Sequence, residues 1–243
     1  MIQIGILGAQ GRMGQQVEKL IKTEFSKSCI VSAAPSRNDS LEPLLKVDVV
    51  IDFSSAGAMA SLARLALLQS SKVPAFVIGS TGWTDMELEV IKHLSHKTTA
   101  LESSNFSTGI YTLRKILKDY SPFLKKLGYT PTLLEVHHEH KKDAPSGTAL
   151  SLQKEIDPLH PGQIQTHSIR AGEVIGDHTV TFYGKGDRIT VSHSAQDRSI
   201  FARGAIEVAL WLAQSRESKE LPTGLLNMDH YFNALKSKGT TDE

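Results

Sequence analysis

The sequence predicts an α/β protein with two domains: an N-terminal doubly wound parallel sheet, and an α+β domain built on a mixed sheet. In roughly the first hundred residues, apolar runs alternate with helical stretches, which is the pattern of a parallel sheet with right-handed crossovers. Later in the chain, strand-like stretches follow one another and glycines supply the turns, which is typical of antiparallel pairing. We expect the first domain to comprise residues 1–106 and 199–243, and the second to comprise residues 107–198.

Short apolar runs mark the strands of the first domain. They are Ile2–Leu7, Cys29–Ala34, Val47–Phe53 and Ala75–Ile78. A helix should follow the first run from about Gly11 to Thr23. Another should open near Thr84, where the acidic residues of the first turn suit the positive end of a helix.

One long amphipathic helix should open the second domain, from Gly109 to Leu127, because apolar residues recur there at three- and four-residue spacing. A short helix should begin at Ser146. The expected strands of this domain are Leu133–His140, Gln163–Ile169, His178–Tyr183 and Arg188–Ser194. A final helix, Ser199–Gln214, is strongly apolar along one side, and we expect the chain to fray from Lys236.

Composition and charge exclude several classes of function. The formal net charge of the 243 residues is +1, so no global field attracts nucleic acid or an anionic membrane. No stretch approaches the roughly 20 apolar residues that a membrane span needs. Cys29 is the only cysteine, which excludes an internal disulfide and suits a reducing cytosol. We therefore expect a cytoplasmic protein that binds neither nucleic acid nor membranes.

A glycine turn directly follows the first strand, in the run Gly8-Ala9-Gln10-Gly11-Arg12-Met13-Gly14. Glycines let the backbone approach a pyrophosphate closely, and the free N–H groups of the following helix stabilise its charge. The spacing is G-x-x-G-x-x-G rather than G-x-G-x-x-G, and the alternative is a turn whose glycines serve packing alone. The position after the first strand favours a dinucleotide site in a Rossmann-type domain.

The residues after the second strand bear on the choice of cofactor. An acidic residue about 20 positions after the turn normally binds the ribose hydroxyls. The chain has Ser36 and Arg37 there, and Asp39 lies further along. A serine and an arginine in place of the carboxylate would suit a 2′-phosphate, which favours NADPH over NADH. The alternative is that Arg37 is a solvated loop residue.

The densest chemistry lies between Glu135 and Ala149, where three histidines and two lysines fall within six residues, 137–142. Strand alternation would send His137 and Glu139 to one face and His138 and His140 to the other. Because these side chains would not converge, we expect no metal site. The alternative to a functional site is a solvated run of charges with a capped helix behind it.

A helix start follows the histidines, in the run Ser146-Gly147-Thr148-Ala149. The start of a helix presents free N–H donors to a carboxylate, and a nearby lysine and histidine could add charge-assisted bonds to the same anion. This combination favours an anion site over a solvated run.

At these residues the chain resembles the dihydrodipicolinate reductase family, which acts on 4-hydroxy-tetrahydrodipicolinate in diaminopimelate and lysine biosynthesis. The family signature Glu-x-His-His-x-x-Lys-x-Asp-Ala-Pro-Ser-Gly-Thr-Ala is present from Glu135 to Ala149. Further landmarks follow the family order: Gly8–Gly14, Ile51–Ser54, Gly79–Gly82, Asn105–Ser107, Arg170–Gly172, Gly176–Thr179 and Phe201–Ala205. The resemblance covers almost the whole chain.

The resemblance implies a role for each matching residue. His137 would donate or accept a proton, and Lys141 would donate one. His138, Gly147 and Thr148 would bind the carboxylates of a small dicarboxylate substrate. The cofactor, NADPH first and NADH also, would contact Gly8 to Met13, Gly79, Ser80, Thr81, Ser103, Ser104, Asn105 and Phe106. Ser103 and Ser104 depart from the small apolar pair often found there. The family also implies a homotetramer formed through the sheet of the substrate domain.

Two other functions remain open on the sequence. One is a different two-domain NAD(P)-dependent dehydrogenase, of the aspartate or homoserine type, which would have no reason to carry the His-His-x-x-Lys and Ser-Gly-Thr pairing. The other is a catalytically silent NADPH-sensing or scaffold protein, which would not need to keep His137 and Lys141.

Overall fold

The computed structural model describes residues 1–218 and 223–238. The chain divides into two compact units: residues 1–106 together with the segment from 201 onward, and residues 107–200. The chain leaves the first unit after Phe106 and returns to it at Phe201, close to the boundaries expected from the sequence.

A six-stranded parallel sheet forms the centre of the first unit, in the order β10-β5-β4-β3-β1-β2. From β1 the sheet extends to β2 on one side and to β3, β4 and β5 on the other, which confirms the predicted doubly wound fold. The strands are β1 (Ile2–Leu7), β2 (Cys29–Ala33), β3 (Val49–Asp52), β4 (Ala75–Ile78), β5 (Thr99–Glu102) and β10 (Gly224–Leu226).

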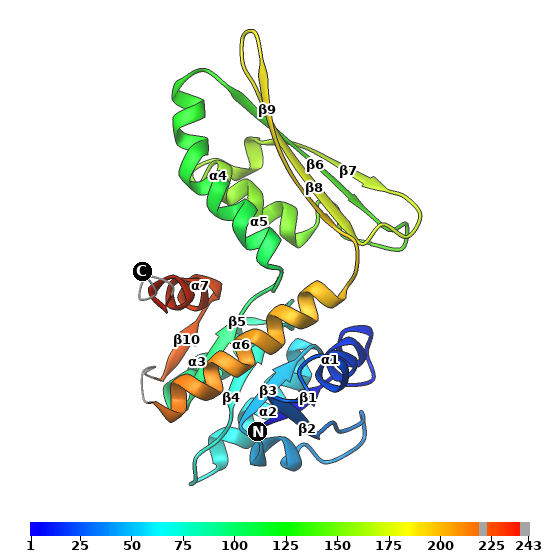
Figure 1. Cartoon of the computed structure of the whole chain (residues 1–243), viewed down its shortest axis with the longest axis vertical. Helices are drawn as coiled ribbons and strands as arrows, with labels where there is room; N and C mark the ends of the chain where they lie inside the picture. The colour runs from blue at the N-terminus through cyan, green and yellow to red at the C-terminus, as the bar shows by residue number, and fades with distance from the viewer. Residues whose placement is uncertain (219–222, 239–243) are drawn as a thin grey trace. The chain divides into compact units, whose positions relative to one another are not determined.

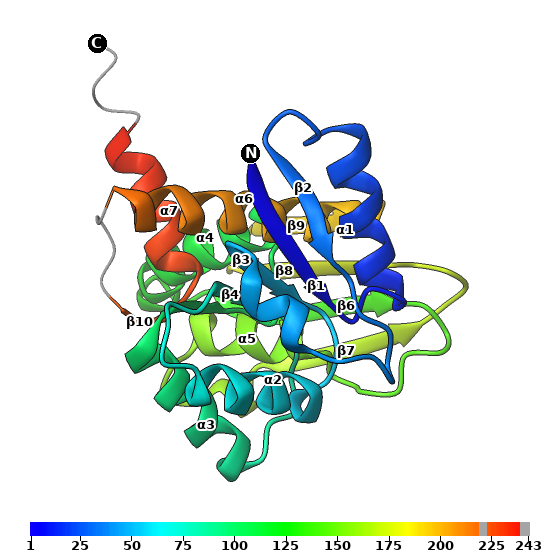
Figure 2. The same cartoon turned by 90° about the horizontal axis from the view of Figure 1, so that it is seen from below.

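Helices cover both faces of this sheet, so its central strands β3 and β4 are buried along their whole length. Figure 2 shows α2 and α3 on one face and α1 and α6 on the other. The core on the α2 side includes Met59, Leu62, Phe76 and Leu94, all fully buried. The helices of the first unit are α1 (Arg12–Thr23), η1 (Glu42–Lys46), α2 (Ala56–Leu68), α3 (Asp85–Lys97), α6 (Ser199–Glu217) and α7 (Met228–Lys238).

The end of the chain differs from the sequence prediction. The sequence indicated Ser199–Gln214 as the final helix, but α7 follows it, and the expected fraying from Lys236 is wrong because α7 extends to Lys238. Residues 239–243 lie outside the described residues.

Tyr231 of α7 is buried with its ring centroid 5.5 Å from that of Trp211 on α6, and this aromatic contact fixes α7 against the unit. Two strands, β5 and β10, were also missed.

The second unit is a four-stranded mixed sheet in the order β7-β6-β8-β9. The β6–β7 pair is parallel and the β6–β8 and β8–β9 pairs are antiparallel, as the fold prediction requires. Both α-helices of this unit lie on one face of the sheet (Figure 1), where they pack on Leu133, Val180 and Phe182. The elements are α4 (Thr108–Lys126), β6 (Thr130–His137), α5 (Gly147–Ile156), η2 (Pro161–Gln163), β7 (Gln165–Arg170), β8 (Gly176–Tyr183) and β9 (Arg188–Ala195).

Strand β6 ends earlier than the sequence indicated. Its last paired residue is His137, opposite Arg170 of β7, and the chain then turns, with Lys141 N–H donating to the His138 carbonyl (3.1 Å). The predicted strand to His140 is therefore wrong, and so is the alternation of faces deduced from it.

Among residues 1–218 and 223–238, no helix combines the length and the apolar character needed to cross a bilayer.

Candidate functional site

Backbone geometry requires glycine at two of the three glycine positions in the turn after β1. Gly8 has φ +86°, and a Cβ there would lie 2.8 Å from the Phe53 carbonyl oxygen. A Cβ on Gly14 would lie 2.3 Å from the Gly8 carbonyl oxygen. Gly11 caps the start of α1 and donates its N–H to Gly8 O (3.0 Å). The turn thus presses the first turn of α1 against the end of β1.

A cavity of about 500 Å³ opens beside this turn, at the carboxyl ends of β1, β2 and β3. The order of the sheet reverses at β1, and such a switch point is where open α/β sheets bind ligands. Its lining includes the predicted Gly8, Ala9, Gln10, Gly11, Ser36 and Arg37. It also includes residues for which we predicted no role, among them Asp39, Ser54, Ser55, Ala58 and Ser61. Arg12 and Met13 begin α1 and do not line the cavity.

Asp39 corrects the sequence interpretation of this cavity. We placed it too far along the chain to matter, but the loop after β2 folds back. Asp39 accepts the Ser36 N–H (2.8 Å), and Gln10 Nε2 donates to Ser36 Oγ (2.7 Å). A carboxylate therefore lines the same cavity as Arg37. The two opposite charges weaken the electrostatic argument for a 2′-phosphate.

A buried carboxylate orders the loops at the ends of β3 and β4. Asp52 is fully buried and accepts hydrogen bonds from the hydroxyls of Ser54 (2.5 Å) and Ser80 (2.5 Å). Burial raises the pKa of Asp52, although these hydrogen bonds act in the opposite direction. The bonds connect Ser80 of the predicted Gly79-Ser80-Thr81 turn to the loop that lines the cavity.

The other predicted cofactor contacts follow β5. Ser103 Oγ donates to the Asn105 carbonyl (2.7 Å), and the buried ring of Phe106 lies edge-on to that of Phe53 at 5.8 Å. A Cβ on Gly79 would lie 2.6 Å from the Phe53 ring. Ser103, Ser104, Asn105 and Phe106 thus lie at the carboxyl edge of the same sheet, outside the lining of the cavity.

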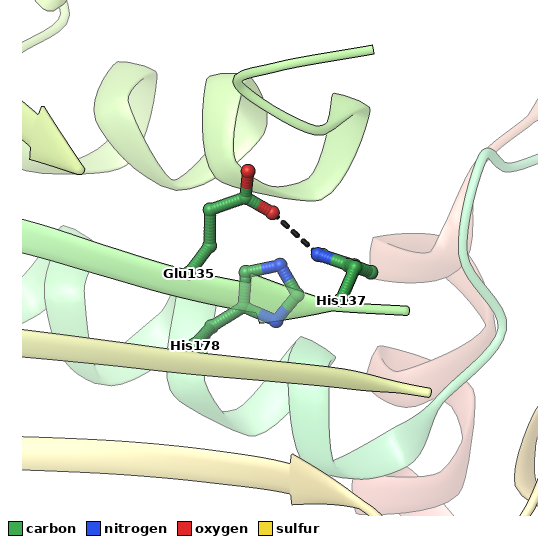
Figure 3. Close-up of side chains that lie close together, drawn as sticks. All are labelled: Glu135, His137 and His178. Atoms are coloured by element: carbon green, nitrogen blue, oxygen red, sulfur yellow. Dashed lines mark ion pairs between the residues drawn. The ribbon is translucent and has the colours of Figure 1, made fainter. Parts of the chain in front are cut away.

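In the second unit, three buried side chains converge: Glu135 and His137 of β6 and His178 of β8 (Figure 3). His137 Nδ1 lies 2.5 Å from Glu135 Oε2. The two imidazole rings meet edge to face, with centroids 5.2 Å apart. His178 Nε2 lies 3.3 Å from the Ser146 hydroxyl, at the start of α5. The strand register brings these groups together, because Glu135 of β6 pairs with His178 of β8.

The other oxygen of Glu135 is held by donors from two further elements. Oε1 accepts from Arg170 Nη2 (2.8 Å) at the end of β7 and from Ser146 N–H (3.3 Å). Arg170 also donates to the carbonyl groups of Lys141 and Asp143. The guanidinium therefore fixes the loop that carries Lys141 against the end of the sheet.

The charge states of this cluster follow from burial and from the neighbouring groups. Burial raises the pKa of Glu135, but hydrogen bonds from Ser168 and Arg170 and the charge of His137 leave it below its usual value. Burial lowers the pKa of His137, and Glu135 opposes this only in part. Burial lowers the pKa of His178 to about 4. Near pH 7 the cluster therefore holds one carboxylate and two neutral imidazoles.

Lys141 and the start of α5 share a carboxylate in this structure. Lys141 Nζ lies 2.7 and 2.9 Å from the two oxygens of Asp143, and the Gly147 N–H donates to the same side chain. Burial raises the pKa of Asp143, but these bonds more than offset it. Apart from its chain neighbours and the backbone of its own helix, no atom of the described residues lies within 4 Å of the point where a Cβ on Gly147 would stand, so this side of the backbone is open. His138 and Thr148, both partly buried, flank this start.

The geometry overturns one reason for expecting no metal. Glu135, His137 and His178 each offer a ligand atom within 4.8 Å of the others, so donors do converge, through a histidine from another strand. However, the Arg170 guanidinium contacts the same carboxylate, and Lys141 lowers the pKa of His137. These cations disfavour a divalent ion electrostatically. The absence of a metal therefore remains a prediction.

Comparison with known proteins identifies the family. The family models "Dihydrodipicolinate reductase, N-terminus" and "Dihydrodipicolinate reductase, C-terminus" match residues 2–106 and 109–232. The chain belongs to the dihydrodipicolinate reductase family. Relatives named 4-hydroxy-tetrahydrodipicolinate reductase include that of Campylobacter jejuni, 34% identical over 88% of this chain and 94% of the relative. That of Zymomonas mobilis is 36% identical over 87% and 92%. As a member of the dihydrodipicolinate reductase family, the chain is an oxidoreductase.

Solved structures agree with the fold of a dihydrodipicolinate reductase. A dipicolinate-bound dihydrodipicolinate reductase from Paenisporosarcina has a TM-score of 0.75 and 22% identity, over 93% of this chain and 97% of that one. An engineered D-amino acid dehydrogenase bound to NADP⁺ has a TM-score of 0.52 and 14% identity, over 93% and 92%.

The buried, neutral state of His178 generates a prediction for stability. An ordinary histidine has a pKa of 6.5, whereas folding lowers that of His178 to about 4. Between these values the unfolded chain binds a proton that the folded chain does not, so stability falls as pH decreases through this window. His178→Gln should remove up to about 3 kcal/mol of the loss between pH 7 and pH 4. Urea unfolding at a series of pH values measures it.

The matched control is His167→Gln, an exposed histidine on the same sheet, which should leave the pH dependence of the wild type intact. Parallel stability curves for the wild type and His178→Gln would contradict the buried neutral state of His178.

Proposed function

We propose that this chain catalyses the NAD(P)H-dependent reduction of 4-hydroxy-tetrahydrodipicolinate to tetrahydrodipicolinate, a step of diaminopimelate and lysine biosynthesis. Membership of the family over both units is the observation that carries this proposal. Relatives with this name are 34% and 36% identical over most of the chain. An amino-acid dehydrogenase of the aspartate or homoserine type would not account for the segment from Glu135 to Ala149.

The first unit fits a nicotinamide dinucleotide. The cavity at the switch point has backbone N–H groups and the positive end of α1 at one side, which suits a pyrophosphate. Gly8 to Gly11, Ser36 and Arg37 would hold it there, with Arg12 and Met13 at the start of the helix. Gly79 to Thr81 and Ser103 to Phe106 would contact it along the same edge. When bound, the cofactor supplies a hydride.

Support for the substrate site comes from Asp143. Its carboxylate occupies Lys141 and the Gly147 N–H, so these groups are arranged to bind a carboxylate before any substrate arrives. We infer that a substrate carboxylate replaces that of Asp143 at Gly147 and Thr148, and that His138 binds at the same site. A dicarboxylate suits this position because the start of α5 and Lys141 both favour negative charge.

His137 and Lys141 would move the proton that accompanies the hydride. Reduction of a C=N or conjugated C=C–C=N system leaves negative charge on the atom next to the reduced carbon, and a proton must neutralise it. The imidazole of His137 can exchange a proton, and the Lys141 ammonium can donate one while it screens a carboxylate. No metal is needed for this step.

The sheet of the second unit supports a homotetramer. Its helices cover one face only, and the opposite face exposes Leu134 (38%), Ile169 (45%) and Tyr183 (47%). Apolar side chains on an open sheet face gain free energy when a second copy covers them. We infer that this face joins the subunits, which sedimentation of the purified protein would test.

A cytoplasmic location is part of the proposal. The single cysteine, Cys29, is buried and has no cysteine partner, as suits a reducing compartment.

The activity is tested by the oxidation of NADPH with substrate generated by dihydrodipicolinate synthase. We expect turnover by wild-type protein dialysed against a chelator. His137→Ala and Lys141→Ala should each lower kcat by about 10² or more, because proton transfer is lost, while NADPH binding persists in the first unit.

Matched controls are His140→Ala and Lys142→Ala, exposed neighbours that should keep nearly full activity. No turnover with either nicotinamide cofactor would refute the proposed reaction. Loss of NADPH affinity in His137→Ala would refute the assignment of this residue to proton transfer.

Cofactor preference depends on two opposite charges at one cavity. We propose that NADPH is preferred over NADH, because Arg37 can bind the 2′-phosphate, and that Asp39 limits this preference. Arg37→Ala should reduce the ratio of kcat/KM for NADPH to that for NADH by on the order of tenfold. Asp39→Asn should raise the same ratio, because it removes repulsion but keeps an acceptor for Ser36 N–H. A wild-type protein that prefers NADH would refute this account. So would a shift of the NADPH-to-NADH ratio in the same direction in Arg37→Ala and Asp39→Asn.

A further inference from the structure

Glu135 is a carboxylate near the end of β6, a central strand of the sheet. Its side chain is fully buried, and each of its two oxygens contacts polar groups. Oε1 receives Arg170 and the Ser146 N–H, whereas Oε2 lies 2.5 Å from His137 Nδ1. Among the described residues, neither Oε2 nor His137 Nδ1 has a hydrogen-bond partner of regular geometry, and the short contact between them is at ion-pair distance. At this separation the two atoms must share a proton, because an unprotonated nitrogen and a carboxylate oxygen would repel each other.

We propose that Glu135 is a positioning residue for proton transfer: it holds a proton on His137 Nδ1 and thereby makes Nε2 the atom that exchanges a proton with the substrate. This inference rests on the proposed function, because it assumes that His137 transfers a proton. Neutral imidazole carries its proton on one nitrogen only, so a fixed Nδ1–H leaves the lone pair on Nε2.

Arg170 and Ser146 make Glu135 able to hold this proton without taking it. Arg170 donates to Oε1 and keeps the carboxylate ionised, while the Ser146 N–H fixes its orientation. Ser146 is also the residue that caps α5, since its hydroxyl accepts the Ala149 N–H (3.1 Å). One carboxylate therefore connects the proton-transfer histidine with the start of the helix that would bind the substrate carboxylate.

His178 supports the same arrangement from β8. The Ser146 hydroxyl already accepts from Ala149, so its own proton is available to His178 Nε2 at 3.3 Å. With the Ser146 hydroxyl as donor, neutral His178 would carry its proton on Nδ1. His178 then presents no lone pair on Nδ1 that could compete with Glu135 for the His137 proton.

Gly176 keeps the reactive nitrogen accessible. A Cβ at this position would lie 3.0 Å from His137 Nε2 and 3.3 Å from Cδ2. Any side chain on Gly176 would therefore press on the edge of the imidazole that carries the reactive atom. Glu135 and Gly176 fix the ring from opposite sides, one by a bond at Nδ1 and the other by leaving space at Nε2.

The alternative is that Glu135 is only the partner of Arg170 in a structural ion pair. The two possibilities differ in what Glu135→Gln does to His137. A glutamine keeps the shape, and its amide oxygen can still accept from Arg170 and Ser146. Its NH₂ group would then face His137 Nδ1 and donate to it, which moves the imidazole proton to Nε2. A purely structural role predicts no change in the tautomer.

The first readout is kinetic. Glu135→Gln should lower kcat on the order of 10²-fold and leave KM for NADPH unchanged, because a glutamine NH₂ that donates to Nδ1 prevents the ring from taking up the second proton that Nε2 would pass to the substrate. The limb of the pH–rate profile that reports His137 should move to lower pH by about one unit or more. The reason is that a carboxylate in contact with the ring raises its pKa, whereas Lys141, Arg170 and His178 do not. The matched control is Glu139→Gln, which removes an exposed carboxylate two residues after His137 and should change neither kcat nor the pH–rate profile.

The second readout does not depend on activity. In the full chain with ¹⁵N-labelled histidine, NMR should show His137 protonated on Nδ1 in the wild type and on Nε2 in Glu135→Gln, with assignment by His137→Gln. Gly176→Ala should keep the wild-type tautomer but lose kcat.

These readouts separate the inference from the proposed function. The same His137 tautomer in the wild type and Glu135→Gln, with kcat within twofold, would overturn the positioning role. A tautomer that changes as expected in a protein that does not reduce the substrate would instead refute the proposed reaction. If Glu135→Gln unfolds, the wild-type spectrum decides, because a His137 proton on Nε2 in the wild type would contradict the positioning role. Full activity of Gly176→Ala would contradict the required space at Nε2.

Discussion

The contact between Glu135, Arg170 and His137 is the interaction on which the chemistry of the second unit depends. A carboxylate that is fully buried costs several kcal/mol unless other groups compensate for its lost hydration. Here Arg170 supplies the opposite charge, Ser146 an N–H donor, and Ser168 and His137 the remaining contacts. These partners come from β7, the start of α5 and β6, so the carboxylate can be satisfied only when the sheet has its native register.

The strand register explains how the segment from Glu135 to Ala149 forms the candidate substrate site. Pairing of β6 with both β7 and β8 brings Arg170 and His178 beside residues that lie more than 30 positions earlier. The same pairing ends at His137, and the chain then turns so that Lys141 and the start of α5 meet around one carboxylate. In the first unit, the equivalent constraints are the close approach of α1 to the end of β1 at Gly14 and the approach of the chain after β3 to Gly8, neither of which leaves space for a Cβ. Both sites thus depend on backbone geometry set by strand register and by glycine.

Much of this could be read from the sequence, and the failures have physical causes. The doubly wound sheet and the mixed sheet followed from the period of the apolar residues, and the segment from Glu135 to Ala149 indicated the family. Asp39 was misplaced because a loop that folds back cannot be recognised from its spacing. The error at His138 and His140 arose because hydrophobic pattern does not show where a strand leaves its ladder. The role of His178 could not be deduced, since the pairing of β6 with β8 is a tertiary property, although its position in the run from Gly176 to Thr179 was a signal. Strand β10 has only three residues, too few for a periodicity.

The central claim is that the start of α5 and Lys141 bind a carboxylate of the substrate beside His137. A crystal structure of this protein with dipicolinate and NADPH tests it most directly, since dipicolinate carries two carboxylates but is aromatic and is not reduced as the substrate is. We expect one carboxylate at the N–H groups of Gly147 and Thr148, with Asp143 displaced from Lys141 and His137 turned with Nε2 toward the ligand. Dipicolinate bound elsewhere, with the Asp143 carboxylate still on Lys141, would contradict the account.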